Sequence, residues 1–311
     1  MKIVQIGINR EKENHFRILS ELGALSAICD LDSSKAKEYG EKYSVNHYDT
    51  LEKLLSSEEF EGAIITTSTF TDIGIITKFL EAKKHVFVEK PMTFKSEDGE
   101  KLVKLAEKKK VVLTWGHNDR FNPAVSEVKK MGKENKFGDV VMIEFHSENR
   151  IPLNIKNVGI IFDSSVHDID TANWLFEELP IVVFAKARKI KHEYEDFASI
   201  MLVYKNDKVA IISSNWVTPK RLKKFDVVYT DAIVSSDFIS QEIIIEKQNG
   251  KEVIQNEKRE SSILEIQSFL GAIEGKNEPI IKAQQAVNVT KIAEAALLSS
   301  QKGIPIYLDL K

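Results

Sequence analysis

The stretch KIVQIGINREKENHF (residues 2–16) decides the fold, because an apolar run ends at Gly7 and a charged, helix-like segment follows it. Comparable short apolar runs lie at 24–30, 62–67, 85–89 and 111–115. Amphipathic patterns of helical spacing separate them, at 13–22, 33–43, 49–56, 72–83 and 96–109. Short apolar strands that alternate with amphipathic helices predict βαβ units around a parallel sheet. Residues 1–121 are therefore predicted to form a doubly wound α/β domain.

The pattern changes after Pro123, where one helix (123–131) gives way to long β-rich runs. These runs lie at 139–148, 181–190, 197–205, 208–216, 225–231 and 241–247, and IPIYLDL (304–310) is a last strand. Helical patterns lie at 164–177, 261–274 and 283–301, and the charged stretch at 251–260 is predicted to be a solvated loop. Asn206-Asp207 and Asn249-Gly250 are turn signals. Residues 122–311 should thus form an α+β substrate-binding and oligomerisation domain with a large, mostly antiparallel open sheet, whose last helix can pack back on the first domain.

The composition narrows the classes of function. The 311 residues fit two domains of ordinary size. The 44 basic and 47 acidic side chains are evenly spread, which argues against a nucleic-acid partner. No secretion signal and no apolar run of ~18 residues is present, so we expect a cytoplasmic protein with no membrane partner. A single cysteine, Cys29, excludes an internal disulfide, and the scattered histidines lack ligand spacing, so no metal is expected.

The turn after the first strand is an incomplete dinucleotide-binding motif. In a βαβ unit, glycines let the backbone approach a pyrophosphate that the helix N-terminus attracts. Aligned with G-x-G-x-x-G, this turn supplies Gly7, Asn9 and Lys12. Asn9 tolerates the left-handed backbone, and Lys12 can hold phosphate by its charge. The motif is weak, and an ordinary βα turn stays open as the alternative.

Asp30, at the end of the second strand, is the stronger cofactor signal. A carboxylate there can accept hydrogen bonds from both ribose hydroxyls, and it repels a 2′-phosphate, which favours NAD over NADP. The alternative is a helix N-cap or turn role in DLDSS, for which Asp32 and Ser33 also compete.

Three motif-bearing segments then follow in order: HVFVEKPM (85–92), TWGHNDRFNPAV (114–125) and VGIIFDSSVHDIDTANWLF (158–176). They resemble the EKP triplet, the GH-x-x-RFNPA-like segment and the D-x-x-x-H-D helix of the glucose–fructose oxidoreductase / inositol dehydrogenase / MocA (Gfo/Idh/MocA) family. The resemblance covers essentially the whole chain. It implies a Rossmann domain and an NAD(P)-dependent dehydrogenase that acts on CH–OH groups.

The resemblance implies that Lys90, Asp163 and His167 are catalytic. Pro91 confines Lys90 to extended backbone at the strand end, where a lysine can polarise or protonate a carbinol oxygen. His167 lies four residues after Asp163, on the same face of a helix, and histidine suits proton transfer near neutral pH. From the residues alone, a solvated lysine and a packing histidine remain alternatives.

On the cofactor side, the resemblance implies that Glu89 contacts the nicotinamide ribose or Lys90. It also implies that Thr66 and Thr67 line the nicotinamide side of the pocket, although TTSTFTD lacks the proline and histidine common in that loop. His15 matches a histidine of the family's first helix, and both a packing role and a functional role remain open for it.

Candidates for the substrate side are Arg120, Asn122, Asn149 and Arg150. The stretches at 149–170 and 221–242 are similar to the UDP-N-acetylglucosamine 3-dehydrogenase branch of the family, and Arg150 and Lys156 could meet a diphosphate through charge-assisted hydrogen bonds. We therefore expect hydride transfer between the nicotinamide and a secondary alcohol of a sugar or sugar nucleotide, with C3 of UDP-N-acetylglucosamine as one candidate. His167 or Lys90 would accept the hydroxyl proton.

Two rival functions remain on the sequence alone. One is a non-enzymatic ligand-binding or regulatory protein with a degenerate dinucleotide loop, and the other is a dihydrodiol- or biliverdin-type reductase. The second half has too few helices to cover both faces of its sheet, so we expect a homodimer or homotetramer that packs through that sheet.

Overall fold

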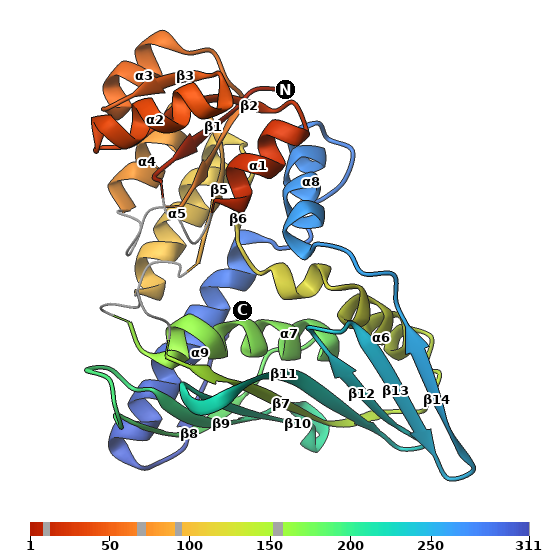
Figure 1. Ribbon diagram of the computed structural model, residues 1–311. Helices are drawn as coiled ribbons and strands as arrows, with labels where there is room; N and C mark the ends of the chain where they lie inside the picture. The colour runs from red at the N-terminus through yellow and green to blue at the C-terminus, as the bar shows by residue number, and fades with distance from the viewer. Residues whose placement is uncertain (9–12, 67–72, 91–94, 152–157, 311) are drawn as a thin grey trace. The chain divides into compact units, whose positions relative to one another are not determined.

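The computed structural model describes residues 1–8, 13–66, 73–90, 95–151 and 158–310 (Figure 1). Asn9, Lys12 and Thr67, which the sequence assigned to the cofactor, lie outside the described residues, as do Pro91 and Lys156.

The chain divides into two compact units. The first contains Met1–Gly116 and Ser262–Val287, and the second contains His117–Ser261 and Asn288–Lys311. Residues 262–287 therefore pack within the first unit, although they follow the predicted boundary at 121. The sequence analysis allowed only the last helix to pack back on the first domain.

The first unit contains a parallel sheet of six strands in the order β3-β2-β1-β4-β5-β6. The strands are β1 (Ile3–Ile6), β2 (Leu25–Cys29), β3 (Asn46–Tyr48), β4 (Gly62–Ile65), β5 (His85–Val88) and β6 (Leu113–Trp115). Strands β1, β4 and most of β5 are buried along their length, as expected when helices cover both faces. The strand order reverses between β1 and β4, and such a switch point is where doubly wound sheets bind ligands.

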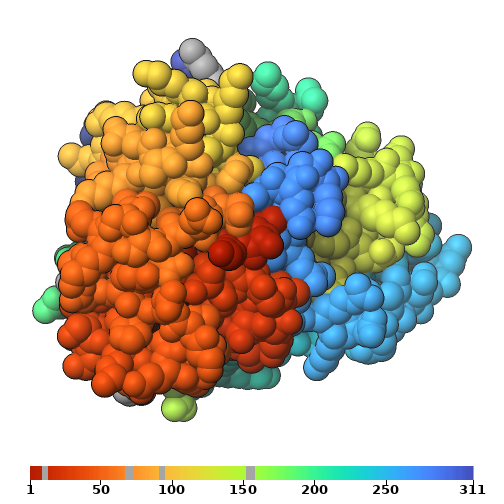
Figure 2. Space-filling view, turned by 90° about the horizontal axis from the view of Figure 1, so that it is seen from above, coloured from red at the N-terminus to blue at the C-terminus, as the bar shows by residue number. Residues whose placement is uncertain are grey.

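The helices of this unit are α1 (Asn14–Glu21), α2 (Ser33–Tyr43), α3 (Leu51–Ser57), α4 (Ile73–Glu81) and α5 (Ser96–Lys109). Helix α8 (Ser261–Ile273) joins them from far along the chain, because Ile266 and Phe269 pack with Ile3, Ile18 and Phe87 in one buried cluster. In a space-filling view, the red and orange atoms of the N-terminal part form one continuous surface (Figure 2).

The second unit contains a sheet of nine strands in the order β14-β13-β12-β11-β7-β10-β9-β8-β15. The strands are β7 (Val140–Arg150), β8 (Val182–Arg188), β9 (Phe197–Val203), β10 (Val209–Asn215), β11 (Val217–Tyr229), β12 (Ile233–Asp237), β13 (Glu242–Lys247), β14 (Gly250–Gln255) and β15 (Ile306–Tyr307). Strands β7 and β10 run parallel, and the other described neighbours run antiparallel. The predicted fold class, a doubly wound parallel sheet followed by an α+β half with a mostly antiparallel sheet, is confirmed.

Helices α6 (Pro123–Lys133) and α7 (Val166–Phe176) lie on one face of this sheet (Figure 1). Alternate strand residues that face them are buried, and Phe145 and Phe225 stack there with ring centroids 5.5 Å apart. Short helical segments lie at η2 (Asn118–Phe121), η3 (Ile161–Ser165) and η4 (Lys205–Asp207), and α9 (Ala283–Lys302) runs toward the end of the chain. In the part of the chain that the structure describes, no helix is long and apolar enough to cross a membrane.

The prediction of a loop at 251–260 is wrong for its first half. Gly250–Gln255 forms β14, which pairs antiparallel with β13 across the Asn249-Gly250 turn. The strand lies at the edge of the sheet and is exposed almost throughout, so its sequence lacks the apolar alternation that marks a half-buried strand.

Candidate active site

Gly7 lies at the carboxyl end of β1, where the strand order of the parallel sheet reverses. Its N–H donates to the carbonyl of Cys29 (2.8 Å), and its φ of 82° lies in the left-handed region that favours glycine. The buried hydroxyl of Thr66, just after β4, donates to the Gly7 carbonyl (2.8 Å) and accepts from the Gln5 side chain (2.7 Å). These bonds fix the backbone from which the incomplete glycine motif starts.

Asp30 follows β2 and reaches across to the same turn. One carboxylate oxygen accepts the N–H of Ile8 (2.6 Å), and the other accepts the N–H of Asp32 (2.8 Å). The N-cap of α2 is Asp32, not Asp30. An ionised carboxylate has further lone pairs, so Asp30 can still accept hydrogen bonds from a ribose diol.

The side chains at the start of the first helix leave its first amides without a capping carboxylate from the N-cap residue. The N-cap residue Glu13 makes no side-chain capping bond, and its carboxylate pairs with Lys42 instead. The first turn of α1 contains no acidic residue. The dipole of the helix therefore favours negative charge at this end.

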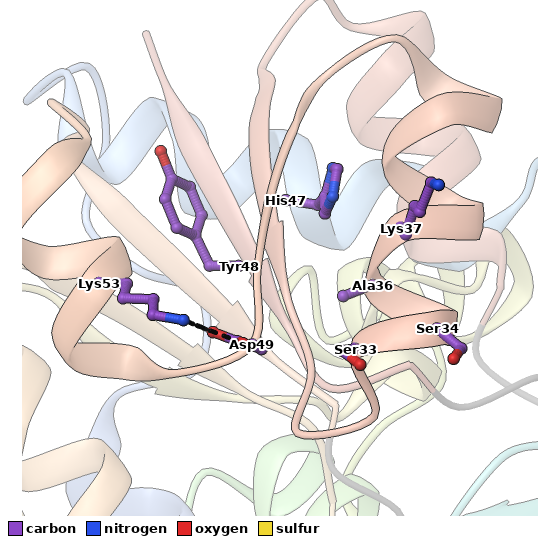
Figure 3. A pocket seen from close by; sticks show the side chains of 8 residues that line it. All are labelled: Ser33, Ser34, Ala36, Lys37, His47, Tyr48, Asp49 and Lys53. Atoms are coloured by element: carbon purple, nitrogen blue, oxygen red, sulfur yellow. Dashed lines mark hydrogen bonds and ion pairs between the residues drawn. The ribbon is translucent and has the colours of Figure 1, made fainter.

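A pocket of about 380 Å³ opens beside the N-terminal end of α2 (Figure 3). Residues of α2, β3 and α3 and the turn between the last two line it: Ser33, Ser34, Ala36, Lys37, His47, Tyr48, Asp49 and Lys53. Asp32 accepts the N–H groups of Ser34 (3.1 Å) and Lys35 (3.2 Å), so the first amides of α2 already have a carboxylate partner.

Glu89 and Lys90 follow β5, and Glu89 occupies the centre of a small polar cluster. Its carboxylate lies 2.8 Å from Nε2 of the buried His15 on α1, and it accepts the N–H of Lys90 (3.2 Å). A Cβ on Gly116 would lie 3.1 Å from the same carboxylate, so a glycine suits that position. The cluster ties α1 to the strand end that carries Lys90, and it gives His15 a partner beyond simple packing.

The first unit fits a dinucleotide in several respects. Its switch point carries a glycine with positive φ, the start of α1 has no acidic residue in its first turn, and Asp30 ends the neighbouring strand. When bound, a nicotinamide supplies the hydride-accepting ring.

In the second unit, Asp163 and His167 lie on one continuous helix. It begins with the π-helical segment η3 and continues as α7. His167 is 9% exposed and Asp163 is half-buried, with Oδ2 accepting the hydroxyl of Ser164 (3.1 Å). A π-helical turn inside a helix is rare and is frequent at functional sites.

A second histidine and an ion pair lie beside His167. The ring of His117 stands edge-on to the ring of His167, with centroids 5.6 Å apart at 82°. Nδ1 of His117 is 4.0 Å from the carboxylate of Asp170, which Arg120 binds with two contacts of 2.6 and 2.7 Å. Arg120 and Asp170 are buried, so a paired charge stands behind the two histidines.

Asp168 is a fully buried carboxyl next to His167 in the chain. Burial raises its pKa to about 7, although the nearby side chains of Lys223 and Ser147 oppose this shift. Lys223 itself pairs with Asp119 at 2.6 Å. The Asp168 carboxyl therefore titrates near neutral pH, far above the range of an ordinary aspartate.

The four residues predicted to bind substrate fall into two pairs. Arg120 binds Asp170, and the buried Asn122 caps α6 through Ala124 N–H (3.0 Å) and donates to the Phe238 carbonyl (2.9 Å). Asn149 and Arg150 are exposed at the end of β7, where Arg150 Nε donates to the Pro219 carbonyl (3.1 Å). The first pair has structural partners, the second faces solvent, and a substrate role for all four stays a prediction.

Both halves of the chain match models of known protein families. Residues 1–117 match the model described as "Oxidoreductase family, NAD-binding Rossmann fold", and residues 125–235 match "GFO/IDH/MocA C-terminal domain". The chain belongs to the GFO/IDH/MocA oxidoreductase family. The first unit is therefore the NAD-binding Rossmann domain of an oxidoreductase.

Several known proteins are similar to this chain over most of their length. The UDP-N-acetylglucosamine 3-dehydrogenase of Acidithiobacillus ferrooxidans is 23% identical over 88% of both chains, and its solved structure superposes with a TM-score of 0.90 over 97% of this chain and 98% of that one. An inositol 2-dehydrogenase of Rhizobium meliloti is 27% identical over 80% of this chain and 81% of that one. An oxidoreductase of Agrobacterium radiobacter, solved with NAD+, L-tartaric acid and magnesium, gives a TM-score of 0.92 at 17% identity over 99% and 98%. The structural likenesses show a common fold.

The sequence did not identify His117, Asp168 and Asp170 as parts of the site. Each lies in a segment that resembles a family motif, GHNDRF or SSVHDID. Their closeness in sequence to His167 and Arg120 is the signal that could have identified them. The pairing of Arg120 with Asp170 joins residues 50 positions apart, and sequence spacing does not show such a contact.

Proposed function

We propose that the protein is an NAD-dependent dehydrogenase that oxidises a secondary alcohol of a sugar or sugar nucleotide, with C3 of UDP-N-acetylglucosamine as the first candidate. The observation that carries the proposal is the buried His167 on the same helix as Asp163, backed by a second histidine and a paired carboxylate. A relative that is 23% identical bears the name of that reaction.

In the proposed mechanism, His167 accepts the proton of the substrate hydroxyl as the carbinol hydrogen leaves as hydride. Histidine is half-protonated near neutral pH, so it can take the proton and later release it. Asp163 orients the substrate or His167. Lys90, at the end of β5, is the other residue able to accept the proton or polarise the carbinol oxygen.

NAD rather than NADP is the proposed cofactor. Asp30 ends β2 and Asp32 caps α2, so two carboxylates lie where a 2′-phosphate would need positive charge or free amides. The pocket of Figure 3 contains Lys37 and Lys53, but Lys53 pairs with Asp49 at 2.7 Å.

A substrate panel tests the function. UDP-sugars, free aldoses and inositols are supplied with NAD or NADP, and absorbance at 340 nm is followed. We expect NADH formation with a UDP-sugar and slower turnover with NADP. The absence of turnover with every substrate, together with no binding of NADH at millimolar concentration in a fluorescence titration, would favour a ligand-binding protein instead.

We further propose that the protein forms a homodimer or homotetramer through the outer face of the nine-stranded sheet. Large apolar side chains are exposed on several of its strands, among them Phe184, Met201, Ile233 and Val253. Phe184 and Met201 are direct neighbours on β8 and β9. Apolar side chains clustered on an exposed sheet are typical of subunit contacts. Light scattering on a size-exclusion column tests this, and a monomer would refute it.

A further inference from the structure

The helix that carries Asp163 and His167 lacks a cap from its own N-cap residue. Ile160 has helical backbone angles and an apolar side chain, and it makes no side-chain capping bond to the π-helical segment that follows. The first amides of a helix need partners, above all where the backbone is buried, as it is at Gly159 and Ile160.

Glu195, between β8 and β9, supplies these partners. Its backbone carbonyl accepts the N–H of Ile160 (2.8 Å), and its side-chain carboxylate accepts the N–H of Ile161. One residue thus holds two successive amides at the helix start. Burial raises the pKa of this carboxyl above its usual range, and the hydrogen bond from Ile161 opposes that shift.

Gly159 makes space for this carboxylate. A Cβ at position 159 would lie 2.0 Å from both the carboxyl carbon and Oε1 of Glu195. No side chain can share that space unless the carboxylate moves away, so a single methyl group at Gly159 would displace it from the helix.

The residue next to Glu195 keeps its backbone in place. The buried Asp196 accepts the N–H groups of Ile190 (2.8 Å), Lys191 (2.6 Å) and His192 (3.1 Å). Its carbonyl accepts the N–H of Trp216 (2.8 Å), after β10. Glu195 therefore extends from an ordered turn.

The opposite end of the helix is held by a buried lysine. Nζ of the buried Lys129, on α6, donates to the carbonyl of Trp174 (2.6 Å) and pairs with Glu177 at 2.8 Å. A cation at the C-terminal end also matches the dipole. The helix is therefore fixed at both ends by side chains from other elements.

We propose that Glu195 is a positioning residue whose carboxylate holds the π-helical turn and so fixes Asp163 relative to His167. Asp163 lies inside that turn and His167 lies in the α-helix after it. A π-helical turn is wider than an α-helical one, so loss of its first hydrogen bond lets Asp163 rotate about the axis relative to His167. The inference rests on the proposed function for the roles of Asp163 and His167.

Four variants and a control test this role. In Glu195→Ala the amides of 161–167 should exchange with deuterium about 10-fold faster. The kcat should fall about 10- to 100-fold with KM nearly unchanged, because the helix remains but the geometry is lost. Glu195→Gln keeps an oxygen that accepts from Ile161, so it should retain most of the kcat.

Gly159→Ala should reproduce the effects of Glu195→Ala, because the methyl group displaces the carboxylate. In the double variant the added methyl group meets no carboxylate, so the double variant should be no worse than Glu195→Ala. The matched control is Glu193→Ala, an exposed glutamate of the same turn, which should behave as the wild type.

Unchanged exchange or unchanged kcat in Glu195→Ala would overturn the role of Glu195, as would additive effects of the two substitutions. If Glu195→Ala does not fold, Gly159→Ala and Glu195→Gln carry the same test. Hydrogen exchange needs no substrate, so a wild type that is inactive with the whole panel would refute the proposed function and not the contact between Glu195 and the helix.

Discussion

The two units position their functional side chains by different means. In the Rossmann unit, Gly7, Thr66 and Glu89 follow the ends of three neighbouring parallel strands, so the sheet itself brings them to one edge. In the second unit, Asp163 and His167 lie on one buried helix, and side chains from distant segments hold that helix. At the strand ends, the sheet fixes the position of the site even when motif residues change. On the helix, the position of the functional side chains depends on each partner that holds the helix.

The largest expected effect comes from the helix site itself. His167→Asn should lower kcat/KM about 10³- to 10⁴-fold, or about 4–5 kcal/mol, because the proposed proton acceptor is lost. NADH affinity, measured by fluorescence titration, should stay within about 2-fold, since a group that acts only in proton transfer contributes to kcat and not to cofactor binding. A loss of activity below about 10-fold would show that another group, with Lys90 first, accepts the proton.

Removal of the buried arginine probes the partners of the helix. Arg120→Leu leaves Asp170 charged and buried without its bidentate partner, so the free energy of unfolding in urea should fall by about 3–5 kcal/mol. The matched control is Arg259→Leu, which breaks an exposed pair with Glu257 and should cost less than about 1 kcal/mol. An equal loss of unfolding free energy in Arg120→Leu and Arg259→Leu would contradict the expectation that a buried ion pair is more costly to break than an exposed one.

The pH dependence of stability should reveal Asp168. Burial raises its pKa to about 7, whereas an unfolded aspartate titrates near about 3.9. Between these values the unfolded chain releases a proton that the folded chain keeps, so this group's contribution to stability is largest below about pH 4 and declines until about pH 7.

Asp168→Asn cannot ionise and should abolish that decline. The free energy of unfolding of Asp168→Asn minus that of the wild type, measured in urea, should rise by about 2–3 kcal/mol from pH 5 to pH 8. Asp231→Asn, at an exposed position, is the control. A constant difference between Asp168→Asn and wild type across this range would contradict a neutral Asp168.

The smallest expected effect is at the strand-end site. Asp30→Asn keeps an oxygen for the Ile8 N–H but loses the negative charge, so the Kd for NADH should rise about 10-fold and the preference over NADPH should narrow. Glu59→Gln changes an exposed acidic residue of the same unit and should leave both values unchanged. If Asp30→Asn lowered kcat/KM more than His167→Asn does, the comparison between the two units would be reversed.

Much of the fold could be predicted because its elements have buried faces. The apolar runs of β1, β4 and β5 and the amphipathic helices between them leave a periodic pattern in the sequence. Strand β3 has three residues and is mostly exposed, and β14 is exposed on both faces, so neither leaves that pattern. The π-helical turn at Ile161–Ser165 has the same composition as an α-helical turn, and a sequence pattern does not separate the two.

The site could be predicted only as far as its motifs extend along the chain. Asp163, His167 and Lys90 stand in short segments that resemble a family, so they could be named. The sequence does not distinguish a buried arginine from a solvated one, and Arg120 was therefore predicted to bind substrate, where the structure gives it Asp170 as partner. Glu195 lies more than thirty residues from the amides it accepts, in a turn with no motif.

The chain's one cysteine gives the protein a practical property. Cys29 ends β2 in the core, and burial raises the pKa of its thiol to about 12, so it is protonated and shielded from alkylating reagents. A cysteine introduced at any exposed position becomes the reactive thiol of the native protein. Spectroscopic probes can therefore be attached at chosen sites without first removing a natural residue.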